Sequence, residues 1–111
     1  MEDKLLIITK IKKTILYIEK IVNNYPHKDL VLKNKILKSS YELLELAYKS
    51  NIIKEKLYIK ECIVKIRMIE FYFKCSFEKK LISYKQFTNL GSYLLEINKM
   101  LNSWILYEKN K

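Results

Sequence analysis

The basic side chains of this sequence recur at helical spacing, and their chemistry suits the binding of phosphate. They form two sets: Lys60, Arg67 and Lys74, and Lys10, Lys13 and Lys20. Residues seven apart lie on one face of a helix, so the first set predicts an axial stripe of positive charge. The second set predicts another stripe, with Tyr17 between its lysines. Such stripes could follow a nucleic-acid backbone, because each contact with a phosphate releases counterions.

A solvated, lysine-rich surface is the competing interpretation of the same charge. The chain has 22 basic and 12 acidic residues and a net charge of +10. The acids that would balance the stripes are Glu19, Glu61, Glu70 and Glu78. All the basic residues except Arg67 are lysine, and Ala47 is the only alanine. Because AT-rich genomes favour this composition, codon bias is a further source of the charge, and the residues alone leave these interpretations open.

Catalytic and metal-binding motifs are absent from the sequence. It has no glycine-rich phosphate loop, no pair of histidines and no nucleophile beside a histidine base. Cys62 and Cys75 fall in one predicted helix without a second ligand at metal spacing, so we expect both to be buried, inert thiols. We therefore predict a protein that is not an enzyme and that binds neither a metal nor a cofactor.

One glycine and one proline among 111 residues leave little material for tight turns, which argues against an all-β fold. Apolar residues instead recur at alternating steps of three and four, the pattern of amphipathic helices. We predict four helices, at about Asp3–Asn23, Asp29–Lys49, Lys54–Lys80 and Ser83–Glu108. Short connections would make each helix antiparallel to the last. The predicted fold is therefore all-α, an up-down-up-down four-helix bundle, with a single domain over residues 1–111.

Each predicted helix carries an inward stripe, which is a row of mainly apolar residues at steps of three and four that we expect to face the core. The four stripes are Ile8, Ile11, Ile15, Ile18 and Val22; Leu32, Ile36, Ser40, Leu43 and Ala47; Ile59, Cys62, Ile66, Ile69 and Phe73; and Phe87, Leu90, Leu94, Ile97, Leu101 and Trp104. Pro26 ends the first helix, since the residue before a proline is pushed out of the helical region. Asp29 is the expected N-cap of the second helix, and Ser83 with Gln86 predicts a capping box at the fourth.

The only glycine and the only tryptophan both lie in the fourth predicted helix. A glycine costs a helix about 1 kcal/mol relative to alanine. We therefore expect Gly91 to permit the close approach of a neighbouring helix. Trp104 lies near the end of the inward stripe and is expected to close the open end of the bundle.

The sequence contains more apolar side chains than the predicted core can bury. Val64 and Phe71 lie outside the inward stripe of the third helix, and Tyr93 and Met100 recur at sevenfold spacing on the fourth. Contiguous exposed apolar surface usually marks an interface, so these four residues predict the interface of a homo-oligomer.

The sequence also bears on the cellular compartment. No run of about 18 apolar residues is present, so we expect no membrane span. The first residues include acids, and lysines follow the first apolar patch, whereas a secretory signal begins with basic residues. We therefore predict a cytoplasmic protein.

Two long segments resemble a known family. They are YPHKDLVLKNKILKSSYELLELAYKS (Tyr25 to Ser50) and KIRMIEFYFKCSFEKKLISYKQFTNLGSYLLEINKMLNSWI (Lys65 to Ile105). The informative features are the aromatic residue before proline, LLEL in the second helix, KLIS before the fourth, and a closing WI. In these features the chain resembles the accessory variability proteins of diversity-generating retroelements. Their wider family includes four-helix proteins encoded in 23S ribosomal RNA intervening sequences.

The resemblance favours the retroelement branch, because LAYKSN and KIRMIEFYFKCS differ from the pattern typical of the intervening-sequence branch. It implies a barrel-shaped homopentamer with a basic surface that binds nucleic acid and a reverse transcriptase. The implied function is a non-catalytic, basic adaptor that binds RNA or DNA in retroelement cDNA synthesis. The alternative is a structural, self-assembling bundle of the intervening-sequence type, with another protein partner and no nucleic-acid role.

Overall fold

The computed structural model of the protein describes residues 3–109. These residues form four α-helices and one short 3-10 helix: α1 (Asp3–Val22), η1 (His27–Asp29), α2 (Leu30–Ile53), α3 (Lys56–Glu78) and α4 (Tyr84–Lys109). No strand occurs among them. The prediction of an all-α protein with four long helices is therefore confirmed. The predicted domain limits, Met1 and Lys111, lie outside the described residues.

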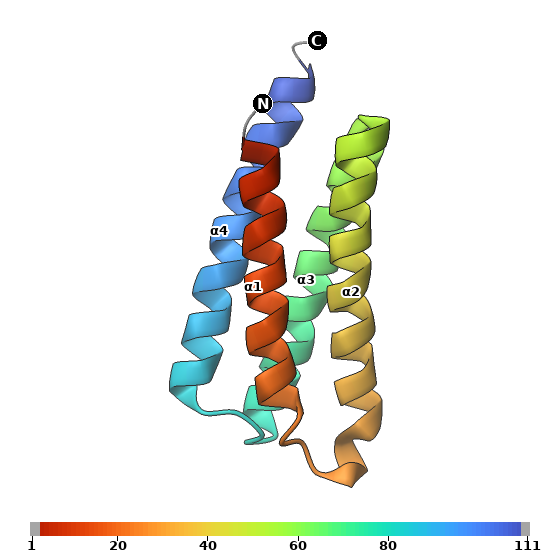
Figure 1. The fold of residues 1–111 in the computed structure, drawn as a ribbon. Coiled ribbons are helices and arrows are strands. Elements are labelled where there is room, and N and C mark those ends of the chain that lie inside the picture. The colour runs from red at the N-terminus through yellow and green to blue at the C-terminus, as the bar shows by residue number, and fades with distance from the viewer. Residues whose placement is uncertain (1–2, 110–111) are drawn as a thin grey trace.

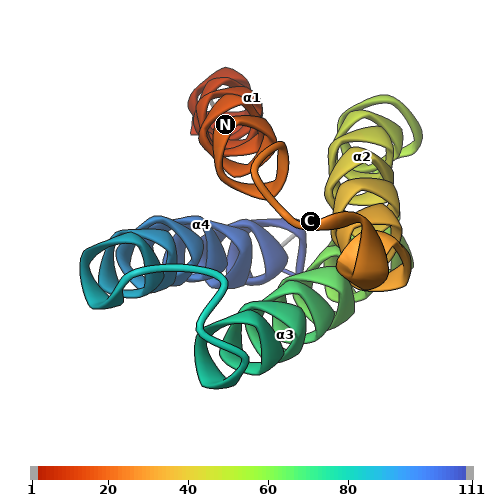
Figure 2. The ribbon, with the colours of Figure 1, turned by 90° about the horizontal axis from the view of Figure 1, so that it is seen from below.

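The four helices lie side by side in a bundle that measures 47 × 22 × 19 Å (Figure 1). α1 packs against α2 and α4, and α3 packs against the same two helices. α1 and α3 are therefore diagonally opposite, as the end-on view shows (Figure 2). The α1–α2 and α3–α4 connections lie at one end of the bundle, and the α2–α3 connection lies at the other. None of the helices within residues 3–109 has both the length and the apolar character needed to cross a bilayer.

The core is built from the predicted stripes. Every stripe residue of α1 and α3 is buried, and the stripes of α2 and α4 are buried except for half-buried Leu32 and Phe87. Trp104 is fully buried near the end of α4, where its Nε1 donates to Oε1 of Glu108 at 3.2 Å. Burial of each large apolar side chain contributes about 1.5–3 kcal/mol. The predicted periodicity therefore identifies most of the core. The buried apolar residues outside the stripes are Ile7, Ile21, Tyr25, Leu46 and Ile82.

Three buried serine hydroxyls are satisfied by their own helices. Ser40 and Ser50 of α2 are fully buried, and each Oγ donates to the carbonyl oxygen four residues earlier, at 2.7 and 2.8 Å. Ser76 of α3 does the same at 2.9 Å. A buried hydroxyl without a partner would cost free energy. These bonds let small side chains occupy the core.

The cysteines differ in burial. Cys62 is buried, with its Sγ 4.0 Å from the carbonyl oxygen of Leu43, and burial raises the pKa of its thiol to about 12. The prediction of a buried thiol is thus confirmed for Cys62. Cys75 is only half-buried, because its neighbour Ser76 occupies the fully buried position on the inner side of α3.

The limits of α2 and α3 differ from the prediction. α2 continues to Ile53 rather than ending near Lys49, and α3 spans Lys56–Glu78 rather than about Lys54–Lys80. The chain reverses at Lys54, which adopts the left-handed conformation (φ 63°) and donates its N–H to the carbonyl of Ser50 at 3.1 Å. Lysine occupies this position although glycine is the usual residue there, so no local residue type marks the turn.

The predicted capping hydrogen bond at the start of α2 is not formed. Asp29 stands at the N-cap position, but its side chain makes no capping hydrogen bond. The 3-10 turn of η1 places Asp29 at φ −105° and ψ 23°, outside the extended conformation that capping requires. The carboxylate is buried instead and accepts a hydrogen bond from Nζ of Lys79 at 3.1 Å. This ion pair ties the start of α2 to the end of α3.

The predicted capping box of α4 is confirmed. The backbone N–H of Gln86 donates to Oγ of Ser83 at 3.1 Å, and the N–H of Ser83 donates to Oε1 of Gln86 at 2.9 Å. Two backbone donors at the helix start are therefore satisfied within four residues.

The expected close approach at Gly91 is wrong. A Cβ built on Gly91 meets no neighbouring atom within 4 Å, and the residue is exposed at the rim of an apolar groove between α3 and α4. The position lies beside the buried stripe rather than in it, so α3 does not press on this backbone.

Because no neighbour opposes a methyl group, Gly91→Ala should raise the free energy of unfolding by up to about 1 kcal/mol. Chemical denaturation followed by circular dichroism measures the change. Gly91→Leu should also be tolerated. A loss of stability in either variant would contradict the open position found here and would indicate a contact made only in an assembly.

Lys80, unlike the Gly91 position, is a site where glycine should stabilise the fold. Lys80 has φ 63°, and the N–H groups of Lys80 and Leu81 donate to the carbonyls of Phe77 and Ser76, both at 2.9 Å, as in a Schellman cap. The left-handed conformation costs lysine about 1–2 kcal/mol, and glycine loses about 0.5–1 kcal/mol more backbone entropy on folding. Lys80→Gly should therefore stabilise by about 0.5–1 kcal/mol in a urea melt.

The matched control is Lys99→Gly, in the interior of α4, which should destabilise by about 1 kcal/mol because its backbone is helical. Equal effects of the two substitutions would show that the α3–α4 connection does not hold Lys80 in the left-handed conformation in solution.

Candidate nucleic-acid interface

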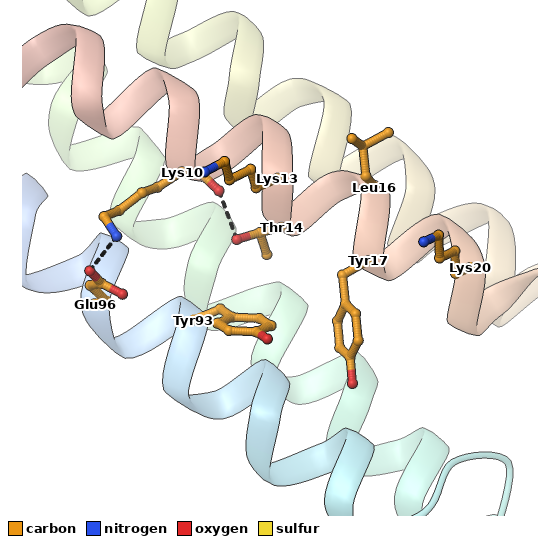
Figure 3. A pocket seen from close by; sticks show the side chains of 8 residues that line it. All are labelled: Lys10, Lys13, Thr14, Leu16, Tyr17, Lys20, Tyr93 and Glu96. Atoms are coloured by element: carbon orange, nitrogen blue, oxygen red, sulfur yellow. Dashed lines mark hydrogen bonds and ion pairs between the residues drawn. The ribbon is translucent and has the colours of Figure 1, made fainter.

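α1 and α4 form a groove lined by basic and aromatic side chains (Figure 3). Its volume is about 360 Å³. Its charged and aromatic residues are Lys10, Lys13, Tyr17 and Lys20 from α1 and Tyr93 and Glu96 from α4. The structure therefore brings the three predicted lysines of α1 to one surface.

Local sequence explains how α1 presents these side chains. Lys10, Lys13, Tyr17 and Lys20 follow each other at steps of three, four and three, so they share one helix face. The buried isoleucines of α1 hold the other side of the helix against the core. The lysines are thus carried on a rigid element rather than on a loop.

The three lysines are not equivalent. Lys10 forms an ion pair with Glu96 across the groove, and its side chain is 33% exposed. Lys13 and Lys20 are exposed, and no carboxylate among the described residues pairs with either of them. Two of the three predicted charges are therefore available to an anion, and the third is largely offset by an acid of the same chain.

Two tyrosines meet between the helices. The ring centroids of Tyr17 and Tyr93 lie 5.4 Å apart, and the ring planes form an angle of 86°. Asn89 of α4 donates from Nδ2 to the hydroxyl of Tyr17 at 3.3 Å, which fixes that ring against α4. Tyr93 is 39% exposed. The sequence placed Tyr93 in an oligomer interface, and only the packing of α1 on α4 reveals its contact with Tyr17.

Comparison with protein families matches residues 5–108 to the bAvd-like family. The match spans all four helices of the structure. This chain belongs to the bAvd-like family. The family is that of the accessory variability proteins of diversity-generating retroelements, so the predicted resemblance is confirmed. A search of curated proteins gives no match to the chain.

The second basic set of this bAvd-like chain lies on the diagonally opposite helix. Lys60, Arg67 and Lys74 are exposed on α3, and Nη1 of Arg67 lies 3.3 Å from Oε1 of Glu70. Val64 and Phe71, 58% and 56% exposed, lie between them at steps of three and four. Basic and apolar side chains therefore alternate along one surface, the α3 outer face, which comprises Lys60, Val64, Arg67, Phe71 and Lys74.

This alternation links two predictions that the sequence treated separately. A partner that covers Val64 and Phe71 must also cover or closely flank the three cations of the α3 outer face. Burying unpaired cations is costly, so such a partner would have to supply acids. The α3 outer face therefore cannot be a free nucleic-acid surface and an apolar oligomer interface at the same time.

The four predicted interface residues lie in three different places. Val64 and Phe71 lie on the α3 outer face, whereas Tyr93 lies in the α1–α4 groove. Met100 is half-buried against the core, two turns beyond Tyr93 on α4. The structure of one chain thus does not join these residues into a single patch.

An acidic groove that the sequence analysis missed lies between α2 and α3. Its volume is about 490 Å³, and its acids are Glu42, Glu45 and Glu61. Lys65 offsets part of this charge, since its Nζ lies 3.1 Å from Oε1 of Glu42. Val64 lines the edge of the groove, so the acidic groove adjoins the α3 outer face.

No metal-binding cluster occurs among the side chains that the structure describes, which are those of residues 5–108 of this bAvd-like chain. Within that range no three His, Cys, Asp or Glu side chains come together in a way that could hold a metal ion. The charged features that remain are thus the basic α1–α4 groove, the acidic groove and the α3 outer face.

Proposed function

We propose that this chain is a non-catalytic, basic, homo-oligomeric adaptor that binds RNA or DNA and a reverse transcriptase in retroelement cDNA synthesis. Membership of the bAvd-like family over residues 5–108 supports the accessory role. The structural observation that carries the nucleic-acid part is the α1–α4 groove, where Lys13 and Lys20 are exposed beside two tyrosines. The reverse-transcriptase part rests on the family alone.

In this proposal the backbone phosphates are the main ligand. Lysine binds phosphate as a point charge, without the fork with which arginine recognises it bidentately. Neither α1 nor α3 presents side chains arranged to read base edges, so binding should show little sequence preference. Several weak contacts carried on one assembly would bind much more tightly than one. Repetition of the groove in an oligomer would therefore strengthen a modest site.

We also propose that an antiparallel, up-down-up-down bundle assembles into a ring, which the family resemblance suggests is a homopentamer. The α3 outer face is basic and apolar, and the acidic groove carries Glu42, Glu45 and Glu61. Contact between the α3 outer face of one copy and the acidic groove of the next would satisfy both charges. Such a contact joins two different, adjoining surfaces, and interfaces of that type form rings where the rotation between copies closes and open filaments where it does not.

The alternative function, a structural bundle with another protein partner and no nucleic-acid role, is favoured by one specific observation. Two of the six predicted phosphate-binding residues already pair with acids of the chain, Lys10 with Glu96 and Arg67 with Glu70. The two functions differ in whether the remaining basic residues bind nucleic acid at moderate salt.

Lys13→Gln combined with Lys20→Gln should weaken binding of a fluorescent oligonucleotide and flatten its salt dependence. For a single strand, each lost phosphate contact lowers the slope of log K against log salt by about 0.7. Fluorescence anisotropy over a series of salt concentrations measures the slope. The α3 variant Lys60→Gln, Arg67→Gln, Lys74→Gln, measured in parallel, shows whether the second stripe also contacts phosphate.

The matched control is Lys35→Gln with Lys38→Gln, which removes two exposed lysines from α2 and changes the net charge equally. If this control flattens the slope as much as the α1 variant, the protein attracts nucleic acid by overall charge rather than through the groove. If the parent binds neither RNA nor DNA near 0.1 M salt, the structural alternative is correct.

Self-association should depend on the α3 outer face. The parent should have a mass well above 13.5 kDa by light scattering coupled to gel filtration at micromolar concentration. Val64→Ser with Phe71→Ser should shift the mass toward that of the monomer, because both side chains are mainly exposed in one chain and contribute little to its own core.

Val31→Ser, which alters an apolar residue of α2 that is 69% exposed, is the control and should leave the assembly intact. A parent that elutes as a monomer would exclude the ring. A larger assembly that survives the double substitution would place the interface elsewhere.

A further inference from the structure

We propose that the α1–α4 groove binds a short stretch of unpaired single strand, with one base against the Tyr17 and Tyr93 rings and with phosphates on either side of that nucleotide, about three base steps apart, on Lys13 and Lys20. This inference rests on the proposed nucleic-acid binding and narrows its ligand. The basic residues alone would bind single strands and duplexes without preference. The juxtaposition of cations with an accessible aromatic pair is what selects a single strand.

The order of residues along α1 fits such a ligand. Tyr17 lies four residues after Lys13 and three before Lys20. Lys13 and Lys20 are therefore separated by about 10 Å along the helix axis. That separation corresponds to about three base steps of a stacked strand. A base that meets Tyr17 would thus lie between the phosphates that reach the two lysines.

The edge-to-face contact between the two tyrosines does not use every ring face of the pair. In an edge-to-face pair the edge of one ring covers a face of the other, so only one of the two rings uses a face in their contact. Tyr93 is 39% exposed, and the hydrogen bond from Asn89 to Tyr17 holds the second ring in place. The groove volume of about 360 Å³ falls within the range of pockets that hold small ligands, about 300–1,000 Å³.

Charge directs the strand within the groove. Glu96 pairs with Lys10 at one end, and its carboxylate would repel a phosphate placed there. Lys13 and Lys20 have no such acid among the described residues. Phosphates are therefore favoured on either side of Tyr17 and disfavoured beside Glu96.

A duplex cannot use this site in the same way. Its bases are stacked and paired inside the helix, so a protein groove meets only sugars, phosphates and base edges. Unpaired bases can turn outward and stack on aromatic side chains. Such stacking tolerates any sequence because every base has a flat face. The chemistry applies equally to single-stranded RNA and DNA.

The test compares two probes of equal length and equal phosphate charge. One is a fluorescent oligo-dT, and the other is an abasic oligonucleotide with the same backbone. We expect the parent to bind oligo-dT at least about fivefold more tightly than the abasic strand, the lower limit for stacking of one base. Tyr17→Leu with Tyr93→Leu should abolish this ratio while leaving affinity for the abasic strand unchanged. A single-stranded RNA of equal length should behave as oligo-dT does.

Three further variants separate stacking from folding. Tyr17→Phe with Tyr93→Phe keeps both ring faces and should retain the ratio. Tyr93→Leu alone removes a partly exposed ring, keeps the bond between Asn89 and Tyr17, and should lower the ratio even if the double leucine variant fails to fold. Tyr84→Leu changes a tyrosine of α4 that is 70% exposed and lies outside the groove, so it should leave the ratio unchanged.

Equal affinity of the parent for oligo-dT and the abasic strand would overturn this inference while the proposed nucleic-acid function stands. So would a ratio that survives loss of both rings. If the parent binds neither strand at low salt, the proposed function fails and this inference fails with it.

Discussion

Burial of one apolar stripe from each helix is the interaction on which the rest of this structure depends. The stripes meet along a bundle only 22 × 19 Å in cross-section, so the core is narrow and each helix keeps an exposed side. The large buried side chains, Trp104 and Phe73 among them, are distributed along the helices rather than gathered at one point. Their burial fixes the rotation of each helix, and that rotation decides which polar side chains reach solvent.

The surface features follow from this fixed rotation. With its isoleucines inward, α1 presents lysines and Tyr17 toward the side that α4 adjoins. With its own stripe inward, α3 presents alternating cations and apolar residues outward. Individual exposed ion pairs such as Arg67 with Glu70 are worth only about 0–1 kcal/mol and do not determine the fold. They decide instead which charges remain available to a ligand, and this distinguishes Lys13 and Lys20 from Lys10.

The connections show how a chain with one glycine reverses direction. Lys54 and Lys80 adopt the left-handed conformation that glycine usually supplies, and backbone hydrogen bonds to the preceding helix hold them there. At the bundle end that contains Lys80, buried Asp29 pairs with Lys79, which follows α3. Some conformational strain is therefore retained at the turns and is offset by helix packing and these local bonds.

The sequence by itself determined the four helices, their inward stripes and the capping box of α4, because periodicity and capping are properties of residues within a few positions of each other. It also identified the two basic stripes, since each lies on one helix. It could not place Tyr93 against Tyr17, Glu96 against Lys10, or Asp29 against Lys79, because these contacts join residues 50 or more positions apart in the chain or on separate helices. Nor could it show that Gly91 faces open space. Only the rotation and pairing of the helices decided these features, and so the tertiary structure, rather than the pattern of lysines, defines the groove.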